Sequence, residues 1–168
     1  CPANEKVYTF LDKVFGEIAE LFPFEYIHMG GDECAKNFWE NNPQIRALMK
    51  KENLKDMHEV QSYFVKRVSK IVSSKGKKMI GWDEILEGGL APNAAVMSWR
   101  GMKGGIEAAK MGHEVVMSPT TFVYLDYMQS DASSRRYRQR APNLRPISGM
   151  ARTRRRIRAG RTGPAAAG

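Results

Sequence analysis

Residues 24–34 have the sequence Phe24-Glu25-Tyr26-Ile27-His28-Met29-Gly30-Gly31-Asp32-Glu33-Cys34, an apolar run followed by two glycines and two carboxylates. The apolar run is typical of a buried strand, which carries no charge until it reaches the edge of its layer. The two glycines lack a Cβ atom, so the backbone can turn tightly there or approach a ligand closely. We therefore expect Asp32 and Glu33 at the carboxyl end of a strand, where α/β proteins hold their functional groups. The alternative interpretation is an acidic surface loop.

Helical and extended segments alternate along the rest of the chain. Apolar residues at three- and four-residue spacing predict an amphipathic helix over residues 4–22, with Asn4 as its N-cap. The buried face expected for this helix contains Val7, Phe10, Leu11, Val14, Phe15, Ile18 and Leu21. Further helices are expected over residues 43–52, 56–74 and 104–111, and strands over residues 24–29, 78–82, 94–99 and 113–118. This alternation predicts an α/β fold with a parallel sheet and helices outside it.

Polar and aromatic residues gather where the expected strands end. These strand ends and the segments just after them contain Trp82, Asp83, Glu84, Trp99, Arg100, Tyr124 and Asp126. Functional side chains at one end of successive parallel strands are the arrangement of a (β/α)₈ TIM barrel. A whole barrel takes about 250 residues, so we expect this chain of 168 residues to form a partial barrel.

The charge of the chain is unevenly distributed. The net charge is +9, but residues 1–131 contain 13 Lys and 3 Arg against all 18 acidic residues, which gives −2. Residues 132–168 contain 11 Arg, no Lys and no acid. We expect residues 1–131 to be a partial TIM-barrel catalytic domain and residues 132–168 to be a disordered Arg-rich tail with little to bury. Two origins of this tail stay open: a basic arm that binds polyanions, or a segment translated out of frame.

Several classes of protein are not expected. No run of about 18 apolar residues suggests a membrane span, and the first residues do not have the pattern of a signal peptide. Cys1 and Cys34 define neither a disulfide framework nor a zinc site. We expect no metal and no other cofactor.

Four motifs occur in order along the chain: His28–Glu33, Gly81–Ile85, Met97–Gly101 and Tyr124–Tyr127. Together they resemble successive strand-end motifs of glycoside hydrolase family 20, the β-N-acetylhexosaminidases. The resemblance runs from Cys1 to about Gln129 and implies the fourth to seventh strands of that family's barrel. It also implies an exported (periplasmic or extracellular) or lysosomal protein.

The resemblance implies substrate-assisted retaining hydrolysis of glycans that end in N-acetylglucosamine or N-acetylgalactosamine. In this mechanism the 2-acetamido oxygen of the substrate attacks the anomeric carbon, and an oxazolinium ion replaces the glycosyl-enzyme ester. Glu33 would be the general acid and then the base. Asp32 would orient the acetamido group through its N–H, and Tyr124 would donate its hydroxyl to the acetamido oxygen. We expect Glu33 to be buried beside Asp32, because an acid that works near neutral pH needs a low-dielectric environment.

The same resemblance assigns the substrate-binding residues His28, Trp82, Glu84, Trp99 and Asp126. The two tryptophans would enclose the acetyl methyl group, Asp126 would accept sugar hydroxyls, and His28 would position the acid by a hydrogen bond. Asp83 and Glu84 are equally well interpreted as partners of Arg100 or of the backbone.

Parts of the family's barrel have no expected counterpart in this chain. No segment of this chain corresponds to the first three strands of the family's barrel, which supply an arginine to the sugar's outer hydroxyls. No segment corresponds to the eighth strand either. A sheet with two open edges is prone to mispair, so we expect impaired activity from the isolated chain. The alternative function is a non-catalytic barrel fragment with a basic tail that binds polyanions or nucleic acid, although the charge of −2 over residues 1–131 argues against nucleic acid. A lacto-N-biosidase with the same centre is a third interpretation.

Overall fold

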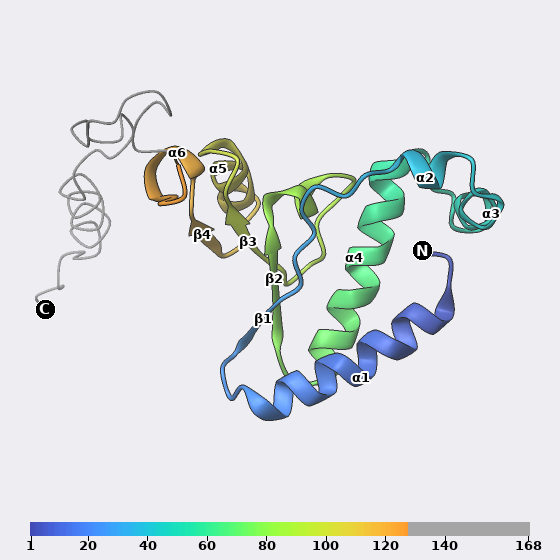
Figure 1. Ribbon diagram of the computed structural model, residues 1–168, viewed down its shortest axis with the longest axis horizontal. Coiled ribbons are helices and arrows are strands. Elements are labelled where there is room, and N and C mark those ends of the chain that lie inside the picture. The colour runs from blue at the N-terminus through green and yellow to red at the C-terminus, as the bar shows by residue number, and fades with distance from the viewer. Residues whose placement is uncertain (128–168) are drawn as a thin grey trace, which may run out of the picture. The chain divides into compact units, whose positions relative to one another are not determined.

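The computed structural model describes residues 1–127, in which short parallel strands alternate with helices (Figure 1). The elements are α1 (Glu5–Leu21), β1 (Tyr26–His28), α2 (Asn37–Glu40), α3 (Pro43–Glu52), α4 (Met57–Ser74), β2 (Lys78–Trp82), the 3₁₀ helix η1 (Asp83–Leu86), β3 (Ala95–Ser98), α5 (Lys103–Lys110), β4 (Val115–Met117) and α6 (Thr120–Val123). The four strands form one sheet in the order β1-β2-β3-β4, and all three pairs are parallel. The predicted α/β class with a parallel sheet is therefore confirmed. The predicted tail over residues 132–168 lies outside the described residues.

The helices begin where the sequence places their caps. The side chains of Asn4, Asn42 and Asp56 each accept a hydrogen bond of 2.8 to 3.0 Å from a backbone N–H in the first turn of the helix that follows. Such caps satisfy N–H groups that have no partner inside the helix. At the other end of α4, Gly76 has a φ of 71°, the left-handed conformation expected of the glycine that ends a helix.

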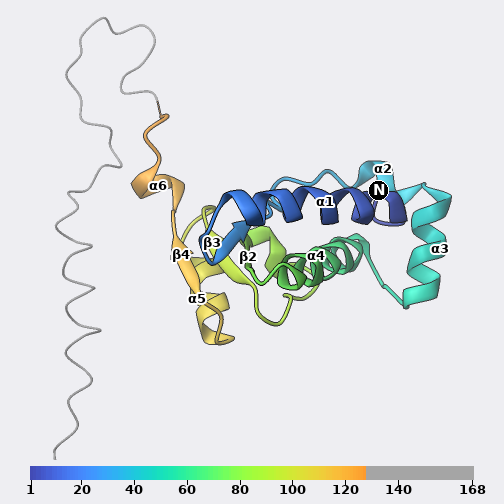
Figure 2. The same ribbon diagram turned by 90° about the horizontal axis from the view of Figure 1, so that it is seen from below.

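The helices cover one face of the sheet. The strands supply Ile27, Met79 and Val96 to the same buried cluster as Phe15 of α1, Val68 of α4 and Ala108 of α5. α1 and α4 lie side by side against this cluster (Figures 1 and 2). Because side chains alternate between the faces of a strand, His28 and Trp82 lie on the opposite face, away from the helices.

Two predictions of burial are wrong. Phe10 and Leu21, assigned to the buried face of α1, are 64% and 74% exposed. The buried residues of α1 are Phe15, as expected, and Tyr8, which the sequence does not assign to this face. β1 is shorter than the predicted strand over residues 24–29, and Phe24 before it is 72% exposed. β1 is an edge strand of the sheet, and an edge strand is covered on fewer sides than a central one.

The chain divides into two units: the first is residues 1–120, and the second begins at residue 121. The first unit contains the whole sheet, and the described part of the second is residues 121–127. Over the described residues, no helix combines the length and apolar character needed to cross a membrane.

Candidate active site

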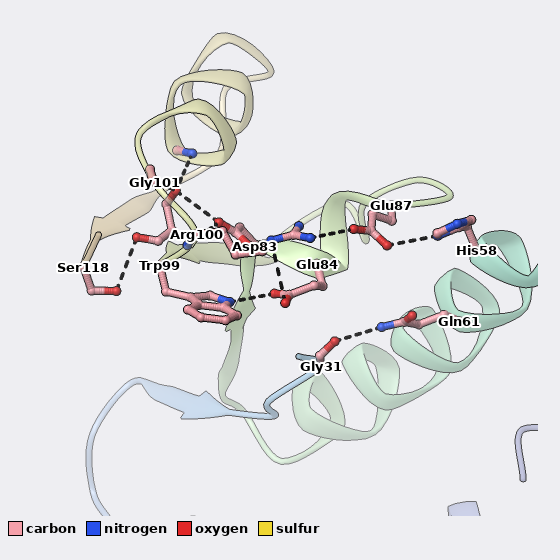
Figure 3. A network of polar contacts seen from close by, with 12 residues as sticks. Gly31, His58, Gln61, Asp83, Glu84, Glu87, Trp99, Arg100, Gly101 and Ser118 are labelled. Carbon is pink, nitrogen blue, oxygen red and sulfur yellow. Dashed lines mark hydrogen bonds and ion pairs between the residues drawn. The ribbon is translucent and has the colours of Figure 1, made fainter. Parts of the chain in front are cut away.

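The loop after β1 is fixed by its backbone to neighbouring elements. The Gly30 carbonyl accepts a hydrogen bond of 3.0 Å from the Trp82 N–H. The Gly31 carbonyl accepts one of 2.8 Å from Nε2 of Gln61, a buried residue of α4 (Figure 3). A Cβ atom on Gly31 would lie 2.7 Å from Cγ2 of Ile85, so only glycine fits at this position without a shift of its neighbour. The loop therefore presents Asp32 and Glu33 from a fixed backbone at the carboxyl end of β1.

Glu33 has an unusual backbone conformation. Its φ is 46°, which follows values of 79° at Gly30 and 103° at Gly31. A non-glycine residue in this region costs about 1–3 kcal/mol, and such residues concentrate at functional sites. Asp32 and Glu33 are both exposed, so the predicted burial of Glu33 is wrong. Burial of Glu33 would require neighbouring groups that cover the loop, and the local sequence pattern does not specify such groups.

Three aromatic side chains form a row across the strand ends. The His28 ring lies 4.8 Å from the Trp82 ring, and the Trp82 ring lies 6.5 Å from that of Trp99 in an edge-on arrangement, both measured between centroids. The sheet register explains the row, since His28 pairs with Ile80, two residues before Trp82. The structure therefore brings together the predicted residues His28, Trp82 and Trp99.

Two buried carboxylates lie next to this row. Asp83 and Glu84 of η1 are 2% and 6% exposed. Nε of Arg100 is 2.7 Å from Oδ1 of Asp83, and Glu84 accepts a hydrogen bond of 2.9 Å from Nε1 of Trp99 (Figure 3). Burial lowers the pKa of Arg100, but hydrogen bonds to Asp83 and Glu87 outweigh this effect and leave the pKa raised. These contacts support the interpretation of Asp83 and Glu84 as partners of Arg100.

His28 contacts the glycine loop. Its Nδ1 accepts a hydrogen bond of 3.0 Å from the Gly30 N–H, and within residues 1–127 it makes no hydrogen bond to Glu33. Desolvation of the ring lowers the pKa of His28, and the nearby Asp32 carboxylate opposes the shift. Because Nδ1 accepts a proton donor here, the neutral ring suits this contact.

We expect a pH dependence from His28. The lowered pKa means that the folded chain binds fewer protons at this ring than the unfolded chain does. The contribution of His28 to the free energy of unfolding therefore rises with pH between the lowered pKa and the usual 6.5. The same contribution is lost as the pH falls through that window. Asp32→Asn should lower the pKa further, because it removes the charge that favours the imidazolium form. An NMR titration of His28 measures both values; Asp12→Asn on α1 is the control, and an unchanged or raised pKa in Asp32→Asn would contradict the assignment.

Tyr124 and Asp126 belong to the second unit, where they follow α6. Tyr124 is half-buried and Asp126 is exposed. The contacts among His28, Trp82, Trp99 and Glu84 all lie within the first unit.

A cavity of about 280 Å³ lies beside the acidic loop. Its lining includes Asp32, Cys34, Trp39 and Gln61. Oε1 of Gln61 is buried without a hydrogen-bond partner in the described structure. Sequence analysis missed Gln61, although a polar residue next to Val60 within an apolar helical stripe is a signal of a specific contact. In the described part of the chain, no group of three or more His, Cys, Asp and Glu residues is arranged to hold a metal ion.

Comparison with known proteins agrees with the four motifs. Residues 1–159 match the family model described as the glycosyl hydrolase family 20 catalytic domain. This range extends beyond Gln129, where we expect the resemblance to end. Two similar curated relatives are named beta-hexosaminidase: one from Porphyromonas gingivalis, 51% identical over 132 residues, and one from Vibrio furnissii, 36% identical over 132 residues. Each alignment covers 78% of this chain, but only 17% and 22% of the respective relatives, so the chain spans about a fifth of their length.

Solved structures give the same result. The exo beta-N-acetylglucosaminidase of Vibrio harveyi, determined in complex with N-acetylglucosamine, is 34% identical with a TM-score of 0.71, over 77% of this chain and 20% of its own. The chitobiase of Flavobacterium johnsoniae is 38% identical with a TM-score of 0.69, over 75% of this chain and 20% of its own. No comparison favours the alternative of a polyanion-binding protein.

Proposed function

Because this chain belongs to glycoside hydrolase family 20, we propose that it carries the acid-base part of the active site of a β-N-acetylhexosaminidase. Such an enzyme removes a terminal N-acetylhexosamine from a glycan. The observation that carries this proposal is the loop after β1, in which Glu33 with a φ of 46° follows two glycines in the left-handed region. A strained acidic residue on a fixed loop is typical of a catalytic group.

We assign the catalytic roles to Asp32, Glu33 and Tyr124. Glu33 protonates the leaving oxygen and then activates water, Asp32 binds the acetamido N–H, and Tyr124 donates to the acetamido oxygen. The exposure of Asp32 and Glu33 leaves both carboxylates accessible to a sugar. A sugar bound over the loop would itself remove water from them.

The substrate-binding residues would be His28, Trp82, Glu84, Trp99 and Asp126. The aromatic row supports this assignment for three of them, because ring centroids 4.8 and 6.5 Å apart form a wall of adjacent aromatic rings. Aromatic rings beside a few polar groups are typical of small-molecule sites. This wall would receive the acetyl methyl group and the apolar face of the sugar.

We further propose that residues 1–131 form a partial TIM barrel, in which β1 to β4 are the fourth to seventh strands. Two observations support this. The helices that join the core cover one face of the sheet, and His28 and Trp82 lie on the other, as the alternation of side chains requires. The strands are parallel and follow chain order, as in a barrel.

The proposal is tested by the need for the acetamido group. At high protein concentration, the purified chain should slowly release 4-nitrophenol from 4-nitrophenyl N-acetyl-β-glucosaminide, and release from 4-nitrophenyl β-glucoside should be at least about 100-fold slower. The matched glucoside has a hydroxyl in place of the acetamido group, so it lacks the intramolecular nucleophile together with the contacts of the N–H and the methyl group. Equal rates with both substrates would contradict substrate-assisted hydrolysis.

A further inference from the structure

Two adjacent carboxylates are buried next to the tryptophans of the aromatic row. Asp83 and Glu84 follow Trp82 in the one-turn helix η1, and both are more than nine-tenths buried. A buried carboxylate is unfavourable unless a positive charge and hydrogen bonds compensate for the loss of water. Two such groups side by side need a common cation.

Arg100 is that cation. Its Nε is 2.7 Å from Oδ1 of Asp83 and 3.7 Å from Oε1 of Glu84. Its backbone N–H donates to Oδ2 of Asp83 at 3.3 Å. Arg100 is therefore bound to Asp83 by both side chain and backbone, and it compensates Glu84 at longer range.

Glu84 connects this charge to the aromatic row. While Oε1 faces Arg100, Oε2 accepts the hydrogen bond of 2.9 Å from Nε1 of Trp99 (Figure 3). The indole N–H is the single donor of a tryptophan side chain. A hydrogen bond to a fixed carboxylate therefore restricts rotation of the ring that stands edge-on to Trp82.

A third carboxylate holds the outer end of Arg100. Its Nη1 lies 3.0 Å from Oε1 of Glu87, and Oε2 of Glu87 lies 2.9 Å from Nδ1 of His58 on α4 (Figure 3). The side chain of Arg100 is 45% exposed, yet it is bound at both ends. The contacts thus run from α4 through Arg100 and Glu84 to Trp99.

We propose that Arg100 is a positioning residue that fixes the indole ring of Trp99 through Glu84. Glu84, which the proposed function assigns to substrate binding, then acts on the sugar site through its hydrogen bond to Trp99. The link to sugar binding rests on the proposed function, whereas the link from Arg100 to Trp99 does not.

Hydrogen exchange of the indole N–H tests the link itself. The chain has three tryptophans, so ¹⁵N–¹H NMR gives three indole signals, and Trp99→Phe identifies one of them. Arg100→Met should speed exchange of the Trp99 signal at least about 10-fold and leave the Trp39 signal unchanged. Glu84→Ala should have the same effect, and Glu84→Gln, which keeps an acceptor oxygen, should restore part of the protection. Arg46→Met on α3 is the matched control.

The affinity for N-acetylglucosamine tests the consequence. Arg100→Met should raise the dissociation constant about 10-fold, as expected when a contact surface loses its fixed geometry, and Arg100→Lys, which keeps the charge, should lie between it and the unchanged chain. Unaltered Trp99 exchange in a folded Arg100→Met would overturn the proposal. If the unchanged chain fails to bind the sugar while Trp99 exchange still depends on Arg100, the positioning link is supported and the proposed function fails.

Discussion

Under the proposed mechanism, Glu33→Gln should abolish most of the hydrolysis of an N-acetyl-β-glucosaminide by this chain. The amide cannot donate a proton to the leaving oxygen or accept one from water, and loss of general acid-base catalysis costs about 10²–10⁴-fold in rate. The loss of rate should be largest for substrates with a poor leaving group, because the departure of such a group depends most on its protonation. The rate of release of 4-nitrophenol and of unsubstituted phenol from the two N-acetyl-β-glucosaminides measures this difference.

The control is Glu20→Gln, which changes an exposed carboxylate on α1 and should leave both rates unaltered. Equal losses for the two leaving groups in Glu33→Gln would contradict the role of Glu33 as the acid. A general effect on folding is excluded by comparing the circular dichroism of the two variants.

Gly88→Ala should destabilise the fold by about 2–5 kcal/mol. Gly88 has a φ of 72°, and an added Cβ atom would lie 2.3 Å from the carbonyl oxygen of His58 and 2.7 Å from the backbone nitrogen of Glu59. These are backbone atoms at the start of α4, so they cannot move aside as a flexible side chain does. The left-handed conformation contributes about 1–2 kcal/mol and the overpacking about 1–3 kcal/mol.

Gly76→Ala separates these two contributions. Gly76 has a φ of 71°, but a Cβ atom there would meet no other atom within 4 Å. We expect a loss of only about 1–2 kcal/mol from the backbone conformation. Urea unfolding of both variants gives the two free energies; equal losses would show that the contact with α4 is not as close as the structure indicates.

The sequence predicts the longer elements well, because their patterns are local. Asn4 and Asp56 mark the starts of α1 and α4, and Gly76 marks the end of α4. The sequence does not predict α2, η1 or α6, each of four residues, since a single turn is too short for a helical period to appear. Burial on α1 is predicted less well, as Phe10 shows, because it depends on which neighbouring element packs against each side.

The sequence predicts which residues belong to the candidate site better than it predicts the contacts between them. The strand-end pattern gathers His28, Trp82 and Trp99, and the structure places their rings next to one another. The pairing of Arg100 with Asp83 and Glu84 is one of the interpretations that the sequence leaves open, and the structure shows these contacts. The hydrogen bond between Gln61 and Gly31 joins segments distant in the chain. A linear pattern does not specify such contacts, since they depend on the register of the sheet and the packing of α4.

The anomeric configuration of the first sugar released tests the central claim most directly. In the proposed mechanism the acetamido group attacks one face of the sugar and water then attacks the other, so the configuration is retained. ¹H NMR of the reaction with 4-nitrophenyl N-acetyl-β-glucosaminide should therefore show the β-anomer of N-acetylglucosamine first, with the α-anomer appearing only as the sugar mutarotates. Release of the α-anomer first, or no release of sugar at all, would contradict the account.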